Sequence, residues 1–310
     1  MPVLYIPHGR RAVLGIAQTL DPASPPADAN YTPYPLVGAA VMRRRNLIVP
    51  PIHSRDWAFL YSDGVQFAQI QLRILCMRHA TGFGLGMDAT LLDWIMARKA
   101  DGDSYAASIR LYDGNATYQF HGCKVQTAQM TVTKGDLIIW NIVAQAPNIG
   151  AQLSTNPSQL VYPQFAETPL TWRDVLFVSG GNIDLQPIYS VEFSVANNLI
   201  MNAPIAEGTE NFGTALARWD GGQMQASATI TLQYYRDDQL ASLYNPNGFD
   251  FGVRYSTPSN RFIRFPRLVA ENPIDLPVNY GPMFKQVQCV ALGTPVSGQA
   301  GTPPIYHATS

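Results

Sequence analysis

Apolar and polar residues alternate strictly along residues 224–234, which is the pattern of a β-strand with one buried and one exposed face. A short helix is predicted next, over residues 237–244, because its apolar residues recur at helical spacing behind two acidic residues suited to an N-cap. The pattern then predicts four more strands, at residues 249–255, 261–265, 269–274 and 284–291. The order is strand, short helix, hairpin, hairpin.

The same order is predicted in the first half of the chain. A strand at residues 66–78 and a helix at 88–99 precede strands at residues 105–112, 116–123, 125–133 and 137–144. Four landmarks recur at similar offsets: 63 and 220 differ by 157, 120 and 265 by 145, 135 and 281 by 146, and 144 and 291 by 147. This regularity predicts an internal duplication. The alternative is a single large β domain whose strands recur because β-sandwiches are repetitive.

The predicted fold class is therefore mostly β, with two tandem β-sandwich or barrel domains that each carry one short flanking α-helix. The domains are predicted at residues 36–146 and 186–293, with an ordered linker at 147–185. Residues 1–35 and 294–310 are predicted to be extended terminal arms, because proline and small polar residues interrupt any regular period there.

Two long loops are predicted between early strands, at residues 47–62 and 200–219. Loops of this length are uncommon in compact domains unless they have a task. Both carry aromatic residues, which suits an interface between subunits. A run of three arginines ends the strand predicted at residues 36–42, and is either a solvated strand end or a contact with acidic groups of a neighbour. The candidate interface residues are Arg43, Arg44, Arg45, Trp57, Phe59, Phe212 and Trp219.

The composition limits what the chain can bind. Its formal net charge is −1, so no general basic field favours nucleic acid or a membrane surface. Hydrophobic residues make up 46% of the chain and charged residues only 14%, which suits a protein that buries much of its surface against other subunits. The same values also fit a β-rich monomer with a neutral polar surface.

No catalytic, cofactor-binding or metal-binding motif is found. The five histidines are scattered, and the nearest approach to a metal site is His79 with His121 and Cys123, whose strands could be neighbours. The three cysteines lie in predicted strands and are expected to be reduced, buried thiols. Paired acids, Asp101 with Asp103 and Asp237 with Asp238, are expected to cap helix ends. We therefore expect no enzyme activity and no cofactor.

The order of elements resembles the major tail tube proteins of long-tailed bacteriophages with non-contractile tails, the siphovirus type. Members of this family have a β-sandwich-like core, one short flanking helix, a long loop between early strands and extended arms. Their last strand pair is split by a Gly-Asp or Gly-Pro turn, as at Gly135-Asp136 and Gly281-Pro282 here. The resemblance is carried by residues 118–123, 135–144, 190–198, 222–235, 237–244, 262–265 and 284–291.

The resemblance implies a structural virion protein, without catalytic residues, made and assembled in the cytoplasm of the host bacterium. Its copies would form stacked rings, a hollow tail tube through which DNA passes at ejection without specific binding. The expected partners are other copies of the chain, a tape measure protein, and tail terminator and distal tail proteins; no membrane is involved. Many relatives have one unit and form hexameric rings, so the doubling implies a homotrimeric ring with pseudo-sixfold symmetry.

Two other functions remain open from the sequence. A two-domain carbohydrate-binding or adhesin module would use Trp57, Trp172 and Trp219 to line sugar sites. A secreted enzyme of jelly-roll type is the third hypothesis. Rings or tubes in electron micrographs favour the tube protein, and discrete monomers that bind glycans favour the module.

Overall fold

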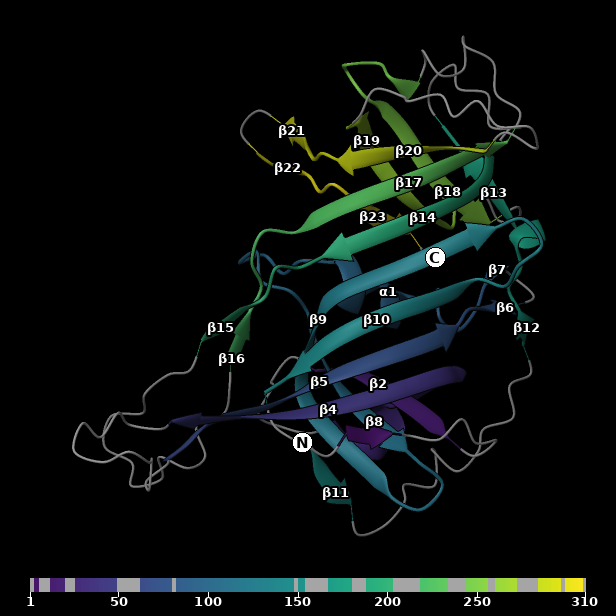
Figure 1. Ribbon diagram of the computed structural model, residues 1–310. Coiled ribbons are helices and arrows are strands. Elements are labelled where there is room, and N and C mark those ends of the chain that lie inside the picture. The colour runs from purple at the N-terminus through teal and green to yellow at the C-terminus, as the bar shows by residue number, and fades with distance from the viewer. Residues whose placement is uncertain are drawn as a thin grey trace.

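The structure is a computed structural model of the chain, shown in Figure 1. It describes residues 3–5, 12–19, 26–48, 62–79, 82–147, 150–153, 167–179, 188–202, 218–233, 243–255, 260–271, 284–296 and 299–308.

The described part of the chain is mostly β, as predicted, with one α-helix. The elements of the first half are β1 (Val3–Tyr5), β2 (Val13–Thr19), β3 (Thr32–Tyr34), β4 (Leu36–Ile48), β5 (Ser62–Leu75), β6 (Met77–His79), β7 (Gly82–Phe83), α1 (Ala89–Met96), β8 (Ala106–Tyr112), β9 (Thr117–Thr133), β10 (Ile139–Ala146) and β11 (Ala151–Leu153). Those of the second half are β12 (Thr168–Pro169), β13 (Val175–Val178), β14 (Ile188–Ala196), β15 (Ile200–Asn202), β16 (Arg218–Asp220), β17 (Gln225–Gln233), β18 (Phe249–Tyr255), β19 (Phe262–Ala270), β20 (Phe284–Ala291), β21 (Thr294–Val296), β22 (Gln299–Thr302) and β23 (Tyr306–Ala308).

A continuous antiparallel sheet crosses both halves of the molecule in the order β4, β5, β10, β9, β14, β17, β20 (Figure 1). Side chains alternate between its two faces, so each row of paired residues faces one side. One row is apolar and almost entirely buried: Ala39, Leu72, Ile142, Ala128, Val195, Ala226 and Ala291. This row and its neighbours on the same face pack into one core that extends across both halves.

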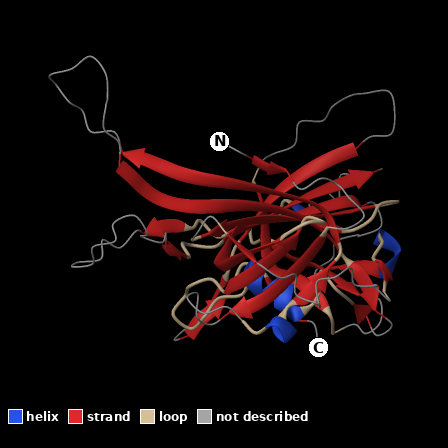
Figure 2. Cartoon of the chain, turned by 90° about the horizontal axis from the view of Figure 1, so that it is seen from below, coloured by secondary structure: helices blue, strands red, loops and turns tan. Residues whose placement is uncertain are grey.

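A second layer covers the buried face, and β9 links the two layers. The first part of β9 pairs with β8, whose other edge pairs with β2, whereas the later part pairs with β10. Gly122 has a positive φ of 62° where β9 passes from one layer to the other. The residue at this position therefore adopts a left-handed conformation that glycine tolerates best. Seen at right angles in Figure 2, the long strands lie above, with helix and shorter strands beneath them.

The same order of pairing occurs in each half. In the first half it is β4, β5, β10, β9, β8, β2, and in the second half it is β14, β17, β20, β19, β18, β13. Like β9, β19 pairs with one neighbour through its first part and with another through its last part, here β18 and β20. The segment predicted as a linker contributes β12 to the first half and β13 to the second.

Helix α1 packs on the buried side of the sheet and confirms the helix predicted at residues 88–99, although it ends earlier. Asp88 caps it, since its Oδ1 accepts a hydrogen bond from the Leu91 amide at 3.2 Å. Trp94 is fully buried, and its indole nitrogen donates to the Cys123 carbonyl at 2.8 Å. The helix predicted at residues 237–244 lies outside the described residues except for Leu243 and Tyr244.

The structure corrects several predicted boundaries. The strands predicted at residues 116–123 and 125–133 are one strand, β9, and the described part of those at 261–265 and 269–274 is one strand, β19. The strand predicted from residue 66 begins earlier, because Asp63 and Gly64 lie within β5 and Asp63 pairs with Leu47 near the end of β4. The three arginines do not end a strand either, because β4 continues through them to Ile48.

The described parts of the terminal segments are not free arms. β2 pairs along its full length with β8, and Leu14 and Ile16 on it are completely buried. At the other end, β23 pairs with β19, and Ile305 just before it is completely buried. Both segments therefore complete the second layer, because their apolar residues Leu14, Ile16 and Ile305 supply core contacts.

Candidate interaction surfaces

Metal-ligating side chains do not cluster in the described residues. No group of three or more His, Cys, Asp and Glu side chains that could hold a metal ion is present among them. His121 has its Nδ1 atom 3.1 Å from the Ser108 hydroxyl. Burial, with a smaller contribution from the charge of Arg110, lowers the pKa of His121 and favours the neutral ring.

The three cysteines are buried free thiols, as predicted. Burial raises the pKa of all three, that of Cys289 to about 12. Because the thiolate is the reactive form, these thiols are chemically inert packing groups.

Two β-hairpins project from the same side of the molecule, where the long loops are predicted (Figures 1 and 2). The first is formed by β4 and β5, which remain paired as far as Ile48 and Ser62. The second is formed by β15 and β16, in which Ile200 pairs with Asp220 and Asn202 with Arg218. On β15, Ile200 is 62% exposed and Met201 is 40% exposed. These two exposed apolar side chains are accessible for contact with another molecule.

The two hairpins touch at their bases. The rings of Phe67 on β5 and Trp219 on β16 pack edge to face, with centroids 5.5 Å apart. Of the candidate interface residues, Trp219 therefore holds the hairpins together at their base. Trp57, Phe59 and Phe212 lie outside the described residues.

The three arginines lie on the first hairpin. The guanidinium carbon of Arg43 lies 5.6 Å from the centroid of the Tyr118 ring within the same chain. The backbones of Arg44 and Arg45 pair with Phe67 and Gln66, and their side chains are outside the described part of the structure. The predicted contact with acidic groups of a neighbour stays a prediction for these two residues.

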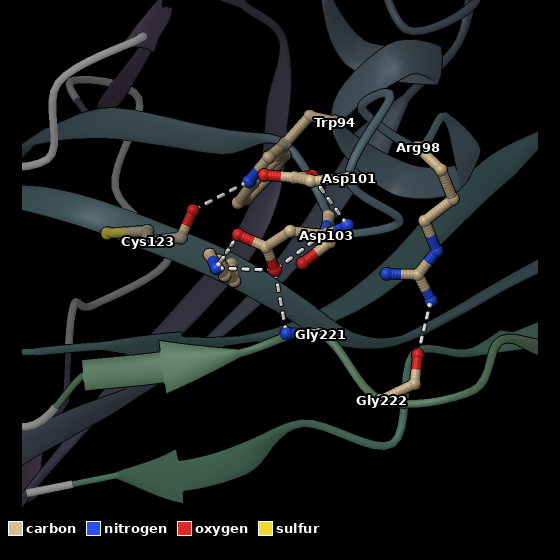
Figure 3. A network of polar contacts seen from close by, with 9 residues as sticks. Trp94, Arg98, Asp101, Asp103, Cys123, Gly221 and Gly222 are labelled. Carbon is tan, nitrogen blue, oxygen red and sulfur yellow. Dashed lines mark hydrogen bonds and ion pairs between the residues drawn. The ribbon is translucent and has the colours of Figure 1, made fainter.

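A polar network fixes the base of the β15–β16 hairpin to the first half of the chain (Figure 3). Arg98, just after α1, donates to the Asn197 side chain at 3.0 Å and to the Gly222 carbonyl at 3.1 Å. The side-chain Nδ2 of Asn197 donates to the carbonyls of Ile95 and Val125, at 3.1 and 2.9 Å. Asn197 is 1% exposed, so its amide satisfies buried backbone groups that would otherwise lack partners.

Asp103 holds the other side of the hairpin base. Its carboxylate accepts hydrogen bonds from the Lys124 ammonium at 2.6 and 2.8 Å and from the Gly221 amide at 2.7 Å. Burial raises the pKa of Asp103, but the bonds from Lys124, Gly221 and Ser104 outweigh it and lower the pKa overall. The network therefore contains a carboxylate–ammonium pair between the loop that follows α1 and β9, and the same carboxylate binds Gly221 just after β16.

The two glycines at the end of this hairpin are required by close packing. A Cβ atom on Gly221 would lie 2.8 Å from the Ser104 amide nitrogen, and one on Gly222 would lie 2.2 Å from the Asn198 carbonyl oxygen. A residue with a Cβ atom at either position would therefore disturb the packing of the network.

The outer face of the central sheet is uncovered in the described part of the molecule and nearly free of charge. One row across it consists of Gly38, Arg73, Asn141, Gln129, Ser194, Ser227 and Val290. Further positions on this face include Gln71, Thr127, Glu192, Gln225, Thr229, Gln286 and Gln288. Among these fourteen positions only Arg73 and Glu192 carry charge, and their charges cancel.

Sequence reasoning missed the network residues. Asp103 is expected from the sequence to cap a helix end, but α1 ends at Met96 and Asp103 pairs with Lys124 instead. Asn197 carries no recognisable motif, since its role depends on a contact 102 residues away. The Asp-Gly-Gly sequence at residues 220–222 was the available signal, because consecutive glycines indicate a close backbone approach.

Comparison with protein-family models and with curated proteins finds no match to this chain. None of the helices in the described residues has the length and apolar character needed to cross a membrane.

We predict that replacing Asp103 with asparagine reduces the acid sensitivity of the fold. The pKa of Asp103 is lower in the folded chain than its ordinary value of 3.8, so folding releases protons near and below that pH. The stability that this carboxylate provides is thus fully present at neutral pH and is lost as pH falls below about 4. Asp103→Asn removes this contribution, and its stability should be lower than wild type at pH 7 but should fall less steeply on acidification.

Urea unfolding measured from pH 7 down to pH 2.5 checks this expectation. Asp101→Asn is the matched control, because Asp101 is exposed and its carboxylate accepts a hydrogen bond from the backbone amide of Asp103. Equal acid slopes for Asp103→Asn and wild type would contradict the assigned role.

Proposed function

We propose that this protein is the tube-forming subunit of a long-tailed bacteriophage with a non-contractile tail. Three chains close into a ring, and rings stack into a hollow tube through which DNA passes. The observation that carries the proposal is the uncovered, nearly neutral outer face of the sheet that runs through both halves. An exposed polar sheet face of this extent, with so little charge, suits the wall of a channel.

A neutral wall suits a channel for DNA. Each phosphate that the wall neutralised would add salt-dependent affinity and slow the passage of DNA. The outer face offers amide and hydroxyl groups, which interact weakly with phosphate in competition with water. Two cationic side chains elsewhere are engaged within the chain: Arg264 bonds to Asp250 through its Nε atom at 2.8 Å, and Arg110 pairs with Asp28 at 2.6 Å.

Ring closure follows from the repeated order of pairing. The repeat supports two tandem units of the tail tube type, the domains predicted at residues 36–146 and 186–293, enlarged by β2 and β13. Inside the chain, β9 of the first unit pairs with β14 of the second over seven residue pairs. We propose that the end of β19 joins β4 of the next chain in the same manner, so that three chains form a closed barrel of six units.

The projecting hairpins are proposed to make contacts between stacked rings. Both emerge on the same side, their bases are fixed, and β15 presents Ile200 and Met201 to solvent. In a virion the tube would also meet a tape measure protein inside and terminator and distal tail proteins at its ends. These partners are proposed from the family resemblance alone.

The carbohydrate-binding hypothesis gains no support from the tryptophans. Trp219 packs edge to face against Phe67, and Trp172 is next to the guanidinium of Arg173, 5.6 Å from its ring centroid. These two residues lie on separate elements, β16 and the 3₁₀ helix Trp172–Asp174, and no contact joins them. Trp57 lies outside the described residues.

Electron microscopy of the purified protein tests the proposal. We expect rings and tubes, and rotational analysis of end-on views should give threefold symmetry with six similar lobes. Strict sixfold symmetry, with six chains and twelve units per ring, would exclude the proposed arrangement. Monomers that bind glycans would favour the carbohydrate-binding module instead.

Deleting residues 203–214 is expected to block stacking but not folding. The deletion removes most of the segment between β15 and β16 and leaves both strands and the polar network in place. The variant should keep the circular dichroism spectrum of the wild type and form rings that do not elongate. Normal tube growth would show that residues 203–214 are not needed for contacts between rings.

Placing lysines on the outer face of the sheet is expected to make the tube retain DNA. A variant with Gln129→Lys, Ser194→Lys and Ser227→Lys adds nine positive charges per three-chain ring to the proposed wall, three on each chain. Short double-stranded DNA should then bind at low salt, resist nuclease, and be released as salt rises, because lysine–phosphate contacts are exchanged for counterions.

The matched control carries Ala89→Lys, Asn115→Lys and Gln152→Lys, at exposed positions away from this face. It adds the same charge but should leave bound DNA open to nuclease. Equal protection by both variants would contradict the assignment of the outer face to the channel.

A further inference from the structure

The first strand of the chain occupies the outer edge of β4. Val3 pairs with Met42, Leu4 with Val41 and Tyr5 with Ala40, all antiparallel. Among the described strands, β1 is the one that pairs with this edge, since the other edge of β4 pairs with β5. An edge strand presents unpaired N–H and C=O groups, and a short covering strand is one way to protect it.

The internal junction between the halves shows what the same edge does elsewhere in the chain. β14 holds the position in the second half that β4 holds in the first: Val195 pairs with Ala226 of β17 as Val41 pairs with Ile70 of β5. Ala226 and Ile70 are themselves equivalent. Ala226 pairs with Ala291 of β20 and Ile70 pairs with Ala144 of β10, and β20 and β10 hold the same place in the two halves. The outer edge of β14 is occupied by β9, with Ala128 opposite Val195.

The two edges are therefore equivalent but have different occupants. Leu4 of β1 lies opposite Val41, at the place that Ala128 of β9 takes opposite Val195. Both occupants run antiparallel to the edge strand. β1 thus stands where a strand equivalent to β9, from another copy of this chain, would have to lie.

The strand equivalent to β9 is β19, and the register identifies its pairing residues. Ala270 of β19 pairs with Cys289 of β20 as Ala128 of β9 pairs with Ile142 of β10. The amide of Glu271 continues this ladder by donating to the Gln288 carbonyl at 2.9 Å. Ala270 of one chain is therefore the expected partner of Val41 in the next.

We propose that β1 is a removable cap on the β4 edge, and that it leaves when β19 of a second copy of the chain docks there. This inference rests on the proposed ring assembly and adds how that assembly is restrained in the free chain. At the equivalent edge of β14 the ladder with β9 has seven residue pairs, whereas β1 forms only three with β4, so this edge can form more backbone hydrogen bonds than β1 provides. The cap keeps isolated chains from pairing at random.

A reversible crosslink tests the cap. Tyr5→Cys with Ala40→Cys places two thiols at paired positions, and Val3→Cys with Met42→Cys is a second pair in the same ladder. The native cysteines are buried with raised pKa values, so oxidation joins the introduced thiols selectively. The oxidised variants should remain monomeric under conditions in which wild type forms rings, and should assemble after reduction.

Removing the cap should have the opposite effect. A chain lacking residues 1–7 should form rings at a protein concentration at least about tenfold lower than wild type requires. In wild type the apparent affinity of one chain for the next is reduced, because only the fraction of chains with an open β4 edge can bind. Sedimentation velocity and electron microscopy measure both variants. The single substitutions Tyr5→Cys and Ala40→Cys, oxidised alone, are the matched controls and should assemble as wild type does.

The outcomes separate this inference from the proposed function. Rings formed equally well by the oxidised double variants and by wild type would overturn the removable cap while leaving the tube proposal intact. An unchanged assembly concentration for the truncated chain would also overturn it. Absence of rings from wild type, truncated and reduced chains alike would overturn both.

Discussion

The antiparallel ladder between β9 and β14 is the interaction on which the architecture depends. It joins β9, the longest strand of the first half, to β14 of the second half through seven residue pairs. Because β9 also pairs with β10 and β8, a single strand connects the two halves and the two layers. The core is consequently continuous, and the halves cannot move apart without exposing Val195, Ala128 and their buried neighbours.

The polar network reinforces this junction at one end. Asn197 follows β14 directly, and its side chain reaches back to Ile95 and Val125 in the first half. Asp103 and Arg98 then hold the glycines that end the second hairpin. The position of the projecting hairpin is thus determined by the junction of the halves, so the outer sheet face and the hairpins keep a fixed relation to each other.

Local signals made much of the fold predictable, and long-range pairing accounts for the rest. Strict alternation gave β17 and β18 nearly to the residue, and a capping aspartate with apolar residues at helical spacing gave α1. The joining of two predicted strands into β9 was not predictable, because Gly122 and Lys124 resemble a break in the alternation. The terminal segments were misjudged because Val13–Thr19 is short, and its burial depends on β8, about ninety residues later. The network around Asn197 left almost no local signal, since each of its contacts spans a long stretch of sequence.

Covalent continuity through the β9–β14 junction changes the energetics of any ring that this chain forms. Bringing two separate molecules together costs roughly 4–15 kcal/mol of translational and rotational freedom. Within one chain the two halves meet at an effective concentration on the order of millimolar, whatever the amount of protein in the cell. A ring of six units built from three such chains therefore has half its contacts formed at synthesis, and only three remain sensitive to dilution.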